Sequence, residues 1–88
     1  MARYSLKIKQ SAVKELERIG SRADRQRIVA RIEKLAEEPR PPGAKKLSGS
    51  ERYRIRQGRF RIVYSIEDEV LIVYVIRIAD RKDVYRSR

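Results

Sequence analysis

The stretch VLIVYVIRI, residues 70–78, constrains the fold of this 88-residue chain more than any other segment. Every residue before Arg77 is aliphatic or aromatic, so a strand formed here has two apolar faces. Strands of that composition are typical of positions inside a sheet, where both faces are buried. We therefore expect a central strand that is covered on both sides for most of its length, with the other elements arranged around it.

Two earlier stretches predict the strands beside it. Residues 52–56 and 59–66 alternate apolar and polar side chains, which is the pattern of half-buried strands. Gln57-Gly58 and Glu67-Asp68-Glu69 have the composition of hairpin turns, so the three strands should follow one another in antiparallel order. Residues 3–8, RYSLKI, alternate in a similar way and predict a further short strand.

Helical spacing begins after that first strand. From Ala12 to about Ile19, apolar side chains recur at three- and four-residue steps, which is the spacing of an amphipathic helix. Ser11 is placed to be its N-cap, and Gly20 is placed to end it.

A second helix is predicted over about residues 23–38, because apolar side chains there are spaced in the same way. The segment Arg40-Pro41-Pro42-Gly43 should stop it, since proline cannot continue the helical hydrogen bonds. We expect a loop over residues 41–50. The two helices should form an antiparallel hairpin on one face of the sheet, so residues 1–88 make one α+β domain of order β-α-α-β-β-β.

The amino-acid composition limits the classes of molecule that the protein is expected to bind. Lys and Arg outnumber Asp and Glu by 23 to 12, and a net charge of +11 favours nucleic acid first, acidic protein second and anionic lipid third. There is no Cys and no His, so we expect no metal site and no cofactor. No apolar run approaches the roughly 18–20 residues of a membrane span, so we expect a cytoplasmic protein.

The cations are most concentrated in RYRIRQGRFR, residues 52–61, where five arginines occur without an acid. A register with Gln57-Gly58 as the turn puts every apolar partner on one face. It pairs Arg56 with Arg59, Ile55 with Phe60, Arg54 with Arg61, and Tyr53 with Ile62. The opposite face then collects four arginines: Arg54, Arg56, Arg59 and Arg61. Like charges facing each other destabilise a sheet, whereas arginine forks suit phosphate oxygens, so this face indicates anion binding.

Four segments carry a resemblance to a known family: GAKKLSG (residues 43–49), YRIRQGRFRIVY (residues 53–64), VLIVYVIRI, and RKDVY (residues 81–85). In this order and spacing, and over nearly its full length, the chain resembles the RelE/ParE superfamily of bacterial toxins. The resemblance implies a small α+β microdomain, which agrees with the periodicity. For the RelE branch it implies a type II toxin that enters the ribosomal A site, cleaves messenger RNA there and is silenced by a cognate antitoxin.

The resemblance also implies five working residues, carried over by motif: Arg54, Arg56, Arg61, Arg81 and Tyr85. Arginines at 54 and 56, where the best-known RelE pattern has lysines, can stabilise charge but cannot shuttle protons. Tyr85 could accept a proton or stack on a base, and the sequence leaves both roles open. We further expect six cations to contact RNA: Lys45, Lys46, Arg52, Arg59, Lys82 and Arg86.

The predicted activity is that of a metal-independent endoribonuclease whose partners are ribosome, messenger and antitoxin. RNA supplies its own nucleophile, the 2′-hydroxyl, so arginines need only stabilise the charge that develops on the phosphate. Two alternatives stay open at this point. One is a ParE-like inhibitor of DNA gyrase, and the other is a nucleic-acid-binding module without catalysis.

Overall fold

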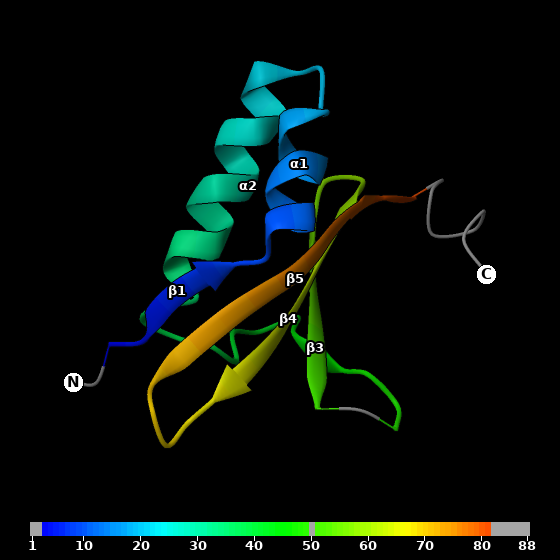
Figure 1. The fold of residues 1–88 in the computed structure, drawn as a ribbon. Helices are drawn as coiled ribbons and strands as arrows, with labels where there is room; N and C mark the ends of the chain where they lie inside the picture. The colour runs from blue at the N-terminus through cyan, green and yellow to red at the C-terminus, as the bar shows by residue number, and fades with distance from the viewer. Residues whose placement is uncertain (1–2, 50, 82–88) are drawn as a thin grey trace.

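The computed structural model describes residues 3–49 and 51–81. Its elements in chain order are β1 (Ser5–Ile8), α1 (Gln10–Glu17), α2 (Arg22–Lys34), β2 (Lys45–Lys46), β3 (Arg52–Gln57), β4 (Phe60–Glu67) and β5 (Ile72–Asp80). The strands form one sheet of order β1-β5-β4-β3-β2, in which β1 runs parallel to β5 and the other neighbours are antiparallel. Figure 1 shows α1 and α2 as a hairpin against one side of this sheet. The predicted α+β architecture is confirmed.

β5 lies inside the sheet, between β1 and β4, as its composition predicted. Val73, Val75 and Ile78 are buried, and a bulge against β4 between Val63 and Tyr64 adjusts the pairing. The expectation that both faces are covered was wrong for the described residues, because the helices lie on one side only. The other face of β5 is half-buried, which leaves that side of the sheet accessible.

The first helix begins earlier than predicted. Its N-cap is Lys9, without a side-chain cap, so Ser11 lies inside α1. The reason is that the ladder of β1 runs directly into the helix: the Lys9 amide donates to the Val75 carbonyl at 2.8 Å, and the Lys9 carbonyl accepts from Ala12 and Val13. The helical hydrogen bonds thus already start at the Lys9 carbonyl, so Ser11 cannot be the N-cap.

The second helix begins as its sequence suggests and ends early. Ser21 caps α2 by accepting from the Asp24 amide at 3.2 Å. The helix stops at Lys34, not near residue 38, because the next amides, from Leu35 to Glu37, donate to carbonyls three residues earlier and tighten the chain into a turn. In the described part of the chain, no helix is long and apolar enough to cross a membrane.

Two connections also differ from expectation. Within the predicted loop over residues 41–50, Lys45 and Lys46 form the short strand β2 against β3. The turn between β4 and β5 occupies residues 68–71, so β5 begins two residues later than the apolar run does. Leu71 adopts a φ of 56° there, and its left-handed backbone ends the turn.

The core lies between the helices and the face of the sheet that they cover. Its members are the buried apolar side chains, among them Ile28, Ile32, Leu35, Ile55, Phe60, Ile62, Tyr64, Val73 and Val75. Tyr64 is fully buried, and its hydroxyl donates to the Pro39 carbonyl at 2.7 Å. Burial raises the pKa of Tyr64 to about 12, so this tyrosine stays protonated and structural.

Candidate nucleic-acid interface

The hairpin of β3 and β4 carries the arginines, and its register differs from the predicted one. Gln57 lies opposite Phe60, Arg56 opposite Arg61, and Arg54 opposite Val63. The turn is therefore Gly58-Arg59, one residue later than expected. The four predicted cross-strand pairs were wrong, but moving the turn by one residue shifts each partner by two positions, so every side chain that stays in the two strands keeps its predicted face.

Glycine conformation explains the shift. Gly58 has a φ of 61°, and Arg59 is outside the positive-φ region. A glycine with positive φ at the first central position is the pattern of a type II′ hairpin turn, whose twist suits antiparallel strands. The alternative turn would have put Gln57 at that first position, where a side chain is strained.

Arg54, Arg56 and Arg61 project from the same face of the sheet, and we call these three residues the arginine face. Arg56 and Arg61 lie directly opposite each other in the ladder, and Arg54 follows on the same side of β3. Their neighbours in sequence, Ile55 and Ile62, are fully buried beneath the helices, so the arginines point to the uncovered side. Arg56 is exposed, whereas Arg54 and Arg61 are half-buried.

Arg81 joins this face at the end of β5. Its amide donates to the Arg59 carbonyl at 2.8 Å, which holds the start of the C-terminal segment against the hairpin turn. Arg56, Arg61 and Arg81 line one depression of about 220 Å³ together with Gly58, Arg59 and Phe60, and no acidic side chain of the described residues lines it. Three of the four predicted catalytic arginines thus line one pocket, and Arg54 lies two residues before Arg56 on the same face of β3.

Arg59, by contrast, lies in the turn and not in the predicted row. Its guanidinium pairs with Asp80 at 3.0 Å and lies over the ring of Phe60, 5.4 Å from the ring centre. An acidic partner offsets its charge, so Arg59 fixes the turn to the end of β5.

The other predicted RNA contacts are placed unevenly. Lys45 lies opposite Arg54 and so extends the arginine face onto β2. Lys46 lies opposite Tyr53 and pairs with Glu51 at 3.7 Å. Arg52 lies on the same side of β3 as Arg54, opposite Ser65. Three predicted residues lie outside the described part of the chain: Lys82, Tyr85 and Arg86.

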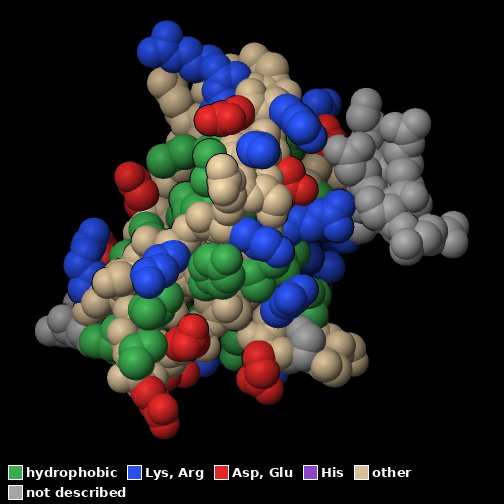
Figure 2. All heavy atoms as spheres, viewed as in Figure 1, with side chains coloured by type: hydrophobic (Ala, Val, Ile, Leu, Met, Phe, Trp, Pro, Cys, Tyr) green, Lys and Arg blue, Asp and Glu red, His purple; other side chains and the backbone are tan. Residues whose placement is uncertain are grey.

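Six of the acids in the described residues form ion pairs away from the arginine face. Six ion pairs join Arg3 to Glu37, Arg27 to Asp24, Arg40 to Asp68, Lys46 to Glu51, Arg59 to Asp80 and Arg77 to Glu15. None of them involves the arginine face, Arg81 or Lys45. Figure 2 shows basic side chains gathered near the end of β5 and acidic ones toward the turn between β4 and β5. The arginine face therefore keeps a positive potential that an anion can use.

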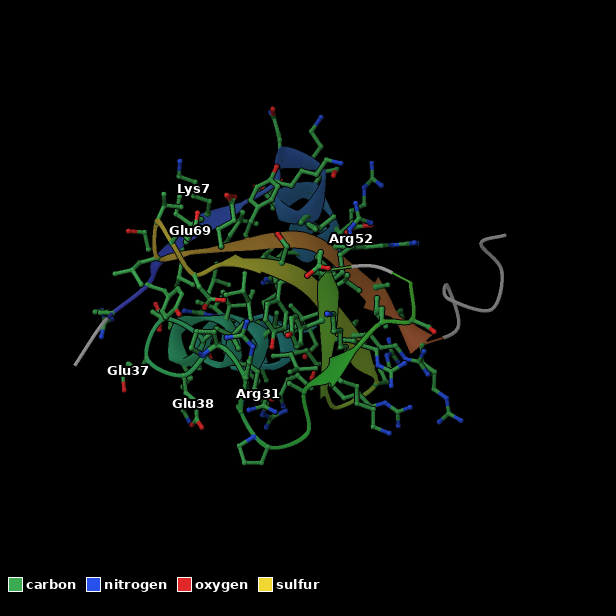
Figure 3. All side chains as sticks on the ribbon, turned by 90° about the horizontal axis from the view of Figure 1, so that it is seen from below. Lys7, Arg31, Glu37, Glu38, Arg52 and Glu69 are labelled. Carbon is green, nitrogen blue, oxygen red and sulfur yellow. The ribbon has the colours of Figure 1, made fainter. Side chains whose placement is uncertain are left out.

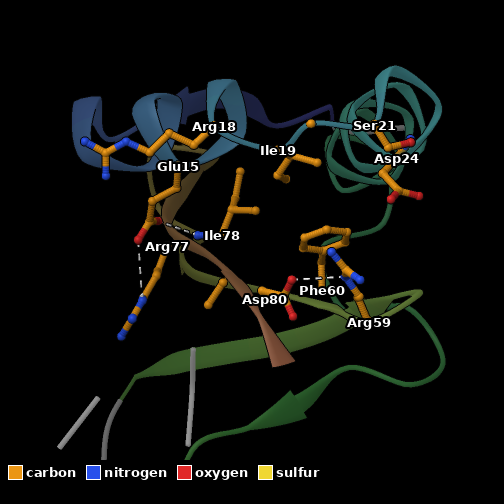
Figure 4. A pocket seen from close by; sticks show the side chains of 12 residues that line it. Glu15, Arg18, Ile19, Ser21, Asp24, Arg59, Phe60, Arg77, Ile78 and Asp80 are labelled. Atoms are coloured by element: carbon orange, nitrogen blue, oxygen red, sulfur yellow. Dashed lines mark hydrogen bonds and ion pairs between the residues drawn. The ribbon is translucent and has the colours of Figure 1, made fainter. Parts of the chain in front are cut away.

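A larger cleft, of about 350 Å³, lies on the helix side (Figure 4). Glu15, Asp24 and Asp80 line it beside arginines, so its charge is mixed and does not suit a phosphate. Glu15 has a structural task there: its carboxylate accepts from the Ile78 amide at 2.8 Å. β1 ends at Ile8, opposite Val75, so beyond that point the edge of β5 that faces away from β4 has no strand beside it in the described residues, and Glu15 satisfies an amide of that open edge.

Sequence reasoning missed Arg31 of α2. In an isolated amphipathic helix Arg31 would lie on the solvated face, yet it is half-buried and lines a second basic depression with Lys45, Arg54 and Arg56. Arg31 comes close to Lys45, Arg54 and Arg56 only because of the path taken by the loop before β2, and no local pattern in the sequence predicts that path.

Comparison with known proteins assigns this fold and its basic face to a class. The chain matches the family of ParE toxins of type II toxin-antitoxin systems (parDE) over residues 6–85, and it belongs to that family within the RelE/ParE superfamily.

Its relatives are RelE proteins. A curated Escherichia coli protein described as RelE-like toxin is 33% identical over 87 residues, which cover 94% of this chain and 90% of that protein. RelE in the archaeal RelE-RelB complex from Pyrococcus horikoshii OT3 is 28% identical, with a TM-score of 0.80 over 92% of this chain and 97% of that one. Isolated E. coli RelE is 31% identical, with a TM-score of 0.75 over 94% and 92%. The chain is thus a RelE-like toxin of the type II class.

Proposed function

We propose that this toxin cleaves messenger RNA in the A site of the ribosome and so stops translation. The observation that carries the proposal is the arginine face, in which Arg56 and Arg61 lie directly opposite each other with no acidic partner among the described residues. Such a pair costs stability in the isolated protein and becomes favourable when a phosphate lies between the two guanidiniums. The matching depression beside Arg81 has room for one phosphate group.

The reaction uses the nucleophile of the substrate. The 2′-oxygen of the ribose attacks the adjacent phosphorus and forms a new P–O bond, its proton passes to a base, and the P–O5′ bond breaks. The products are a 2′,3′-cyclic phosphate and a free 5′-hydroxyl, which takes up a proton. Charge accumulates on the phosphate oxygens along the way, so donors placed in advance around them lower the barrier.

The residues divide these tasks by position. Arg56 and Arg61 hold the scissile phosphate from two strands, Arg54 supports them, and Arg81 at the edge of the pocket assists the leaving 5′-oxygen. Arginine stays protonated at every physiological pH, so the proton acceptor is another group. Tyr85 is the candidate within this chain, either as the acceptor or as a platform on which a base stacks.

The ribosome completes the site. The arginine face is an open surface, which can stabilise charge but cannot by itself hold a flexible strand in attack geometry. A messenger fixed in the decoding site has already lost that freedom, and correct orientation is worth up to about 7–11 kcal/mol of the barrier. We therefore expect cleavage of messenger on ribosomes and little cleavage of the same RNA alone.

An antitoxin is the second partner. Structural relatives include the intact E. coli RelBE toxin-antitoxin complex, to whose toxin this chain is 30% identical with a TM-score of 0.74. A basic surface with unpaired cations favours an acidic chain, so the cognate antitoxin inhibits by covering or displacing what the arginine face binds.

Toe-printing of a messenger in a purified translation system tests the proposal. The toxin should produce cuts within the A-site codon, and Arg61→Ala should abolish them. Arg22→Ala, an exposed position at the start of α2, is the control and should cleave normally. Thermal unfolding must show that Arg61→Ala remains folded, because this side chain is half-buried. Intact messenger and undisturbed translation at saturating toxin would refute the nuclease activity.

The match to the ParE family favours one second candidate, inhibition of DNA gyrase. That activity has no need of arginines aligned on a phosphate. A supercoiling assay with purified gyrase separates the two, because a gyrase inhibitor should block supercoiling and spare messenger, and the nuclease should do the reverse.

A further inference from the structure

A second basic pocket lies beside the first, at the edge of β3. Arg31, Lys45, Arg54 and Arg56 line a depression of about 250 Å³ together with Gly43. The four cations come from three elements: α2, β2 and β3. Figure 3 shows Arg31 between α2 and the loop that leads toward β3. Within residues 3–49 and 51–81, no acidic side chain lines this depression.

The loop before β2 brings these cations together. The Ala44 amide donates to the Pro41 carbonyl at 3.0 Å, and Gly43 takes a φ of 93°, so the chain reverses just before Lys45. Reversal sets Lys45 opposite Arg54 in the ladder. A side chain at residue 43 would be strained at that φ, although the space around Gly43 is open.

Leaving these cations together is unfavourable without a ligand. None of the four has an ion pair within residues 3–49 and 51–81, whereas Arg27, one turn earlier in α2, pairs with Asp24. Four like charges around one depression repel one another, and no ion pair of the described residues offsets this repulsion. The arrangement becomes favourable when an anion enters the pocket.

Arg56 belongs to both pockets. The first pocket extends from Arg56 toward Arg61 and Arg81, and the second extends from Arg56 toward Arg54 and Arg31. Alternate residues of a strand, such as 54 and 56, are about 6.6 Å apart along its axis, on the scale of the step between successive phosphates in an extended nucleic acid strand. A single strand crossing the hairpin therefore meets two anion sites in succession.

We propose that this pocket binds the phosphate of the messenger next to the scissile one, with Arg31 as a substrate-positioning residue. The inference rests on the proposed function and adds a second phosphate subsite to it. With two neighbouring phosphates held, the strand cannot pivot about the first, so the 2′-oxygen between them keeps its direction toward the scissile phosphorus. Arg31 acts on orientation and not on the reacting atoms.

The test uses a short RNA that cannot be cut, with every 2′-hydroxyl methylated, and a second version in which the linkage next to the scissile one is a neutral methylphosphonate. Binding is measured from low to moderate salt for wild type, Arg31→Gln and Arg22→Gln. Arg22 is the matched control, since it lies about 2.5 turns before Arg31, on the opposite side of α2. Unfolding curves establish that each variant is folded.

The wild type should lose about tenfold in affinity when the phosphate becomes neutral, and Arg31→Gln should lose the same on the unmodified RNA and nothing further on the neutral one. The slope of log affinity against log salt should fall by about 0.7 in both cases. Arg22→Gln should match the wild type. Equal sensitivity of wild type and Arg31→Gln to the neutral linkage, or no binding by the wild type at low salt, would overturn the subsite. Cleavage on ribosomes, measured in parallel, reports separately on the proposed function.

Discussion

Replacing Arg56 by glutamine should make the protein more stable and less active. Arg56 lies directly opposite Arg61, with no acid beside either of them in the described residues. Cross-strand pairs of like charge cost about 0.2–1 kcal/mol. Coulomb's law gives a similar value, since two unit charges about 7 Å apart in water repel by about 0.6 kcal/mol. Glutamine removes the repulsion and keeps much of the length of the side chain.

For a domain of this size, about 0.5 kcal/mol corresponds to a rise in Tm of about 2–4 °C. The gain should shrink as salt is added, because the screening length falls from about 10 Å at 0.1 M to about 3 Å at 1 M. Messenger cleavage should fall by about 10²–10³, the usual loss when one donor to a developing negative charge is removed.

Differential scanning calorimetry at both salt concentrations and toe-printing on ribosomes measure the two effects. Arg52→Gln is the stability control, since the uncharged Ser65 lies opposite it, and it should bring no gain in Tm. A variant at 56 that is less stable than the wild type, or that cuts messenger at the wild-type rate, would contradict the reasoning.

Three further predictions concern the scaffold. Arg40 holds the pKa of Asp68 below its ordinary value of about 3.9. The stability that this carboxylate contributes is therefore present above that value and is lost as pH falls through the lower pKa of the folded state. Asp68→Asn should flatten the acid side of a plot of Tm against pH. Glu15→Ala leaves the Ile78 amide without its acceptor and should cost about 1–2 kcal/mol in urea unfolding, whereas Glu15→Gln should cost less; equal losses would contradict the hydrogen bond. Gly58→Ala should lower the free energy of unfolding by about 1–2 kcal/mol because of its left-handed φ, and an unchanged midpoint would mean that the turn is different.

The sequence sufficed for those features that depend on periodicity and composition. The apolar run at residues 70–78 predicted the central strand, and alternation predicted which face of β3 and β4 carries Arg54, Arg56 and Arg61. The side of the sheet on which each side chain lies was predictable, because burial of Ile55 and Ile62 permits only one orientation of the hairpin.

The pairing of residues between β3 and β4 was not predictable in the same way. A turn at Gln57-Gly58 and one at Gly58-Arg59 bury the same side chains, so hydrophobic pattern alone cannot choose between them. The choice falls to the φ of Gly58, a backbone property. The start of α1 depended on a hydrogen bond from Lys9 to the distant Val75. Contacts between elements far apart in the chain leave no trace in local spacing.

The same limit applies to Arg31 and to Glu15. Arg31 lines a pocket formed with a loop and two strands, and Glu15 accepts a hydrogen bond from the Ile78 amide on β5. Both lie on helical positions that look solvated in an isolated helix. Their roles arise only when the helical hairpin is placed against the sheet.

Messenger carrying a single 2′-deoxyribonucleotide at the cut position, placed in the A site of purified ribosomes, tests the central claim most directly. If the arginine face stabilises attack by the neighbouring 2′-oxygen, the all-ribose messenger is cut within the codon and the deoxy version stays intact at that linkage. Equal cleavage of the two messengers, or cleavage of neither, would contradict the account.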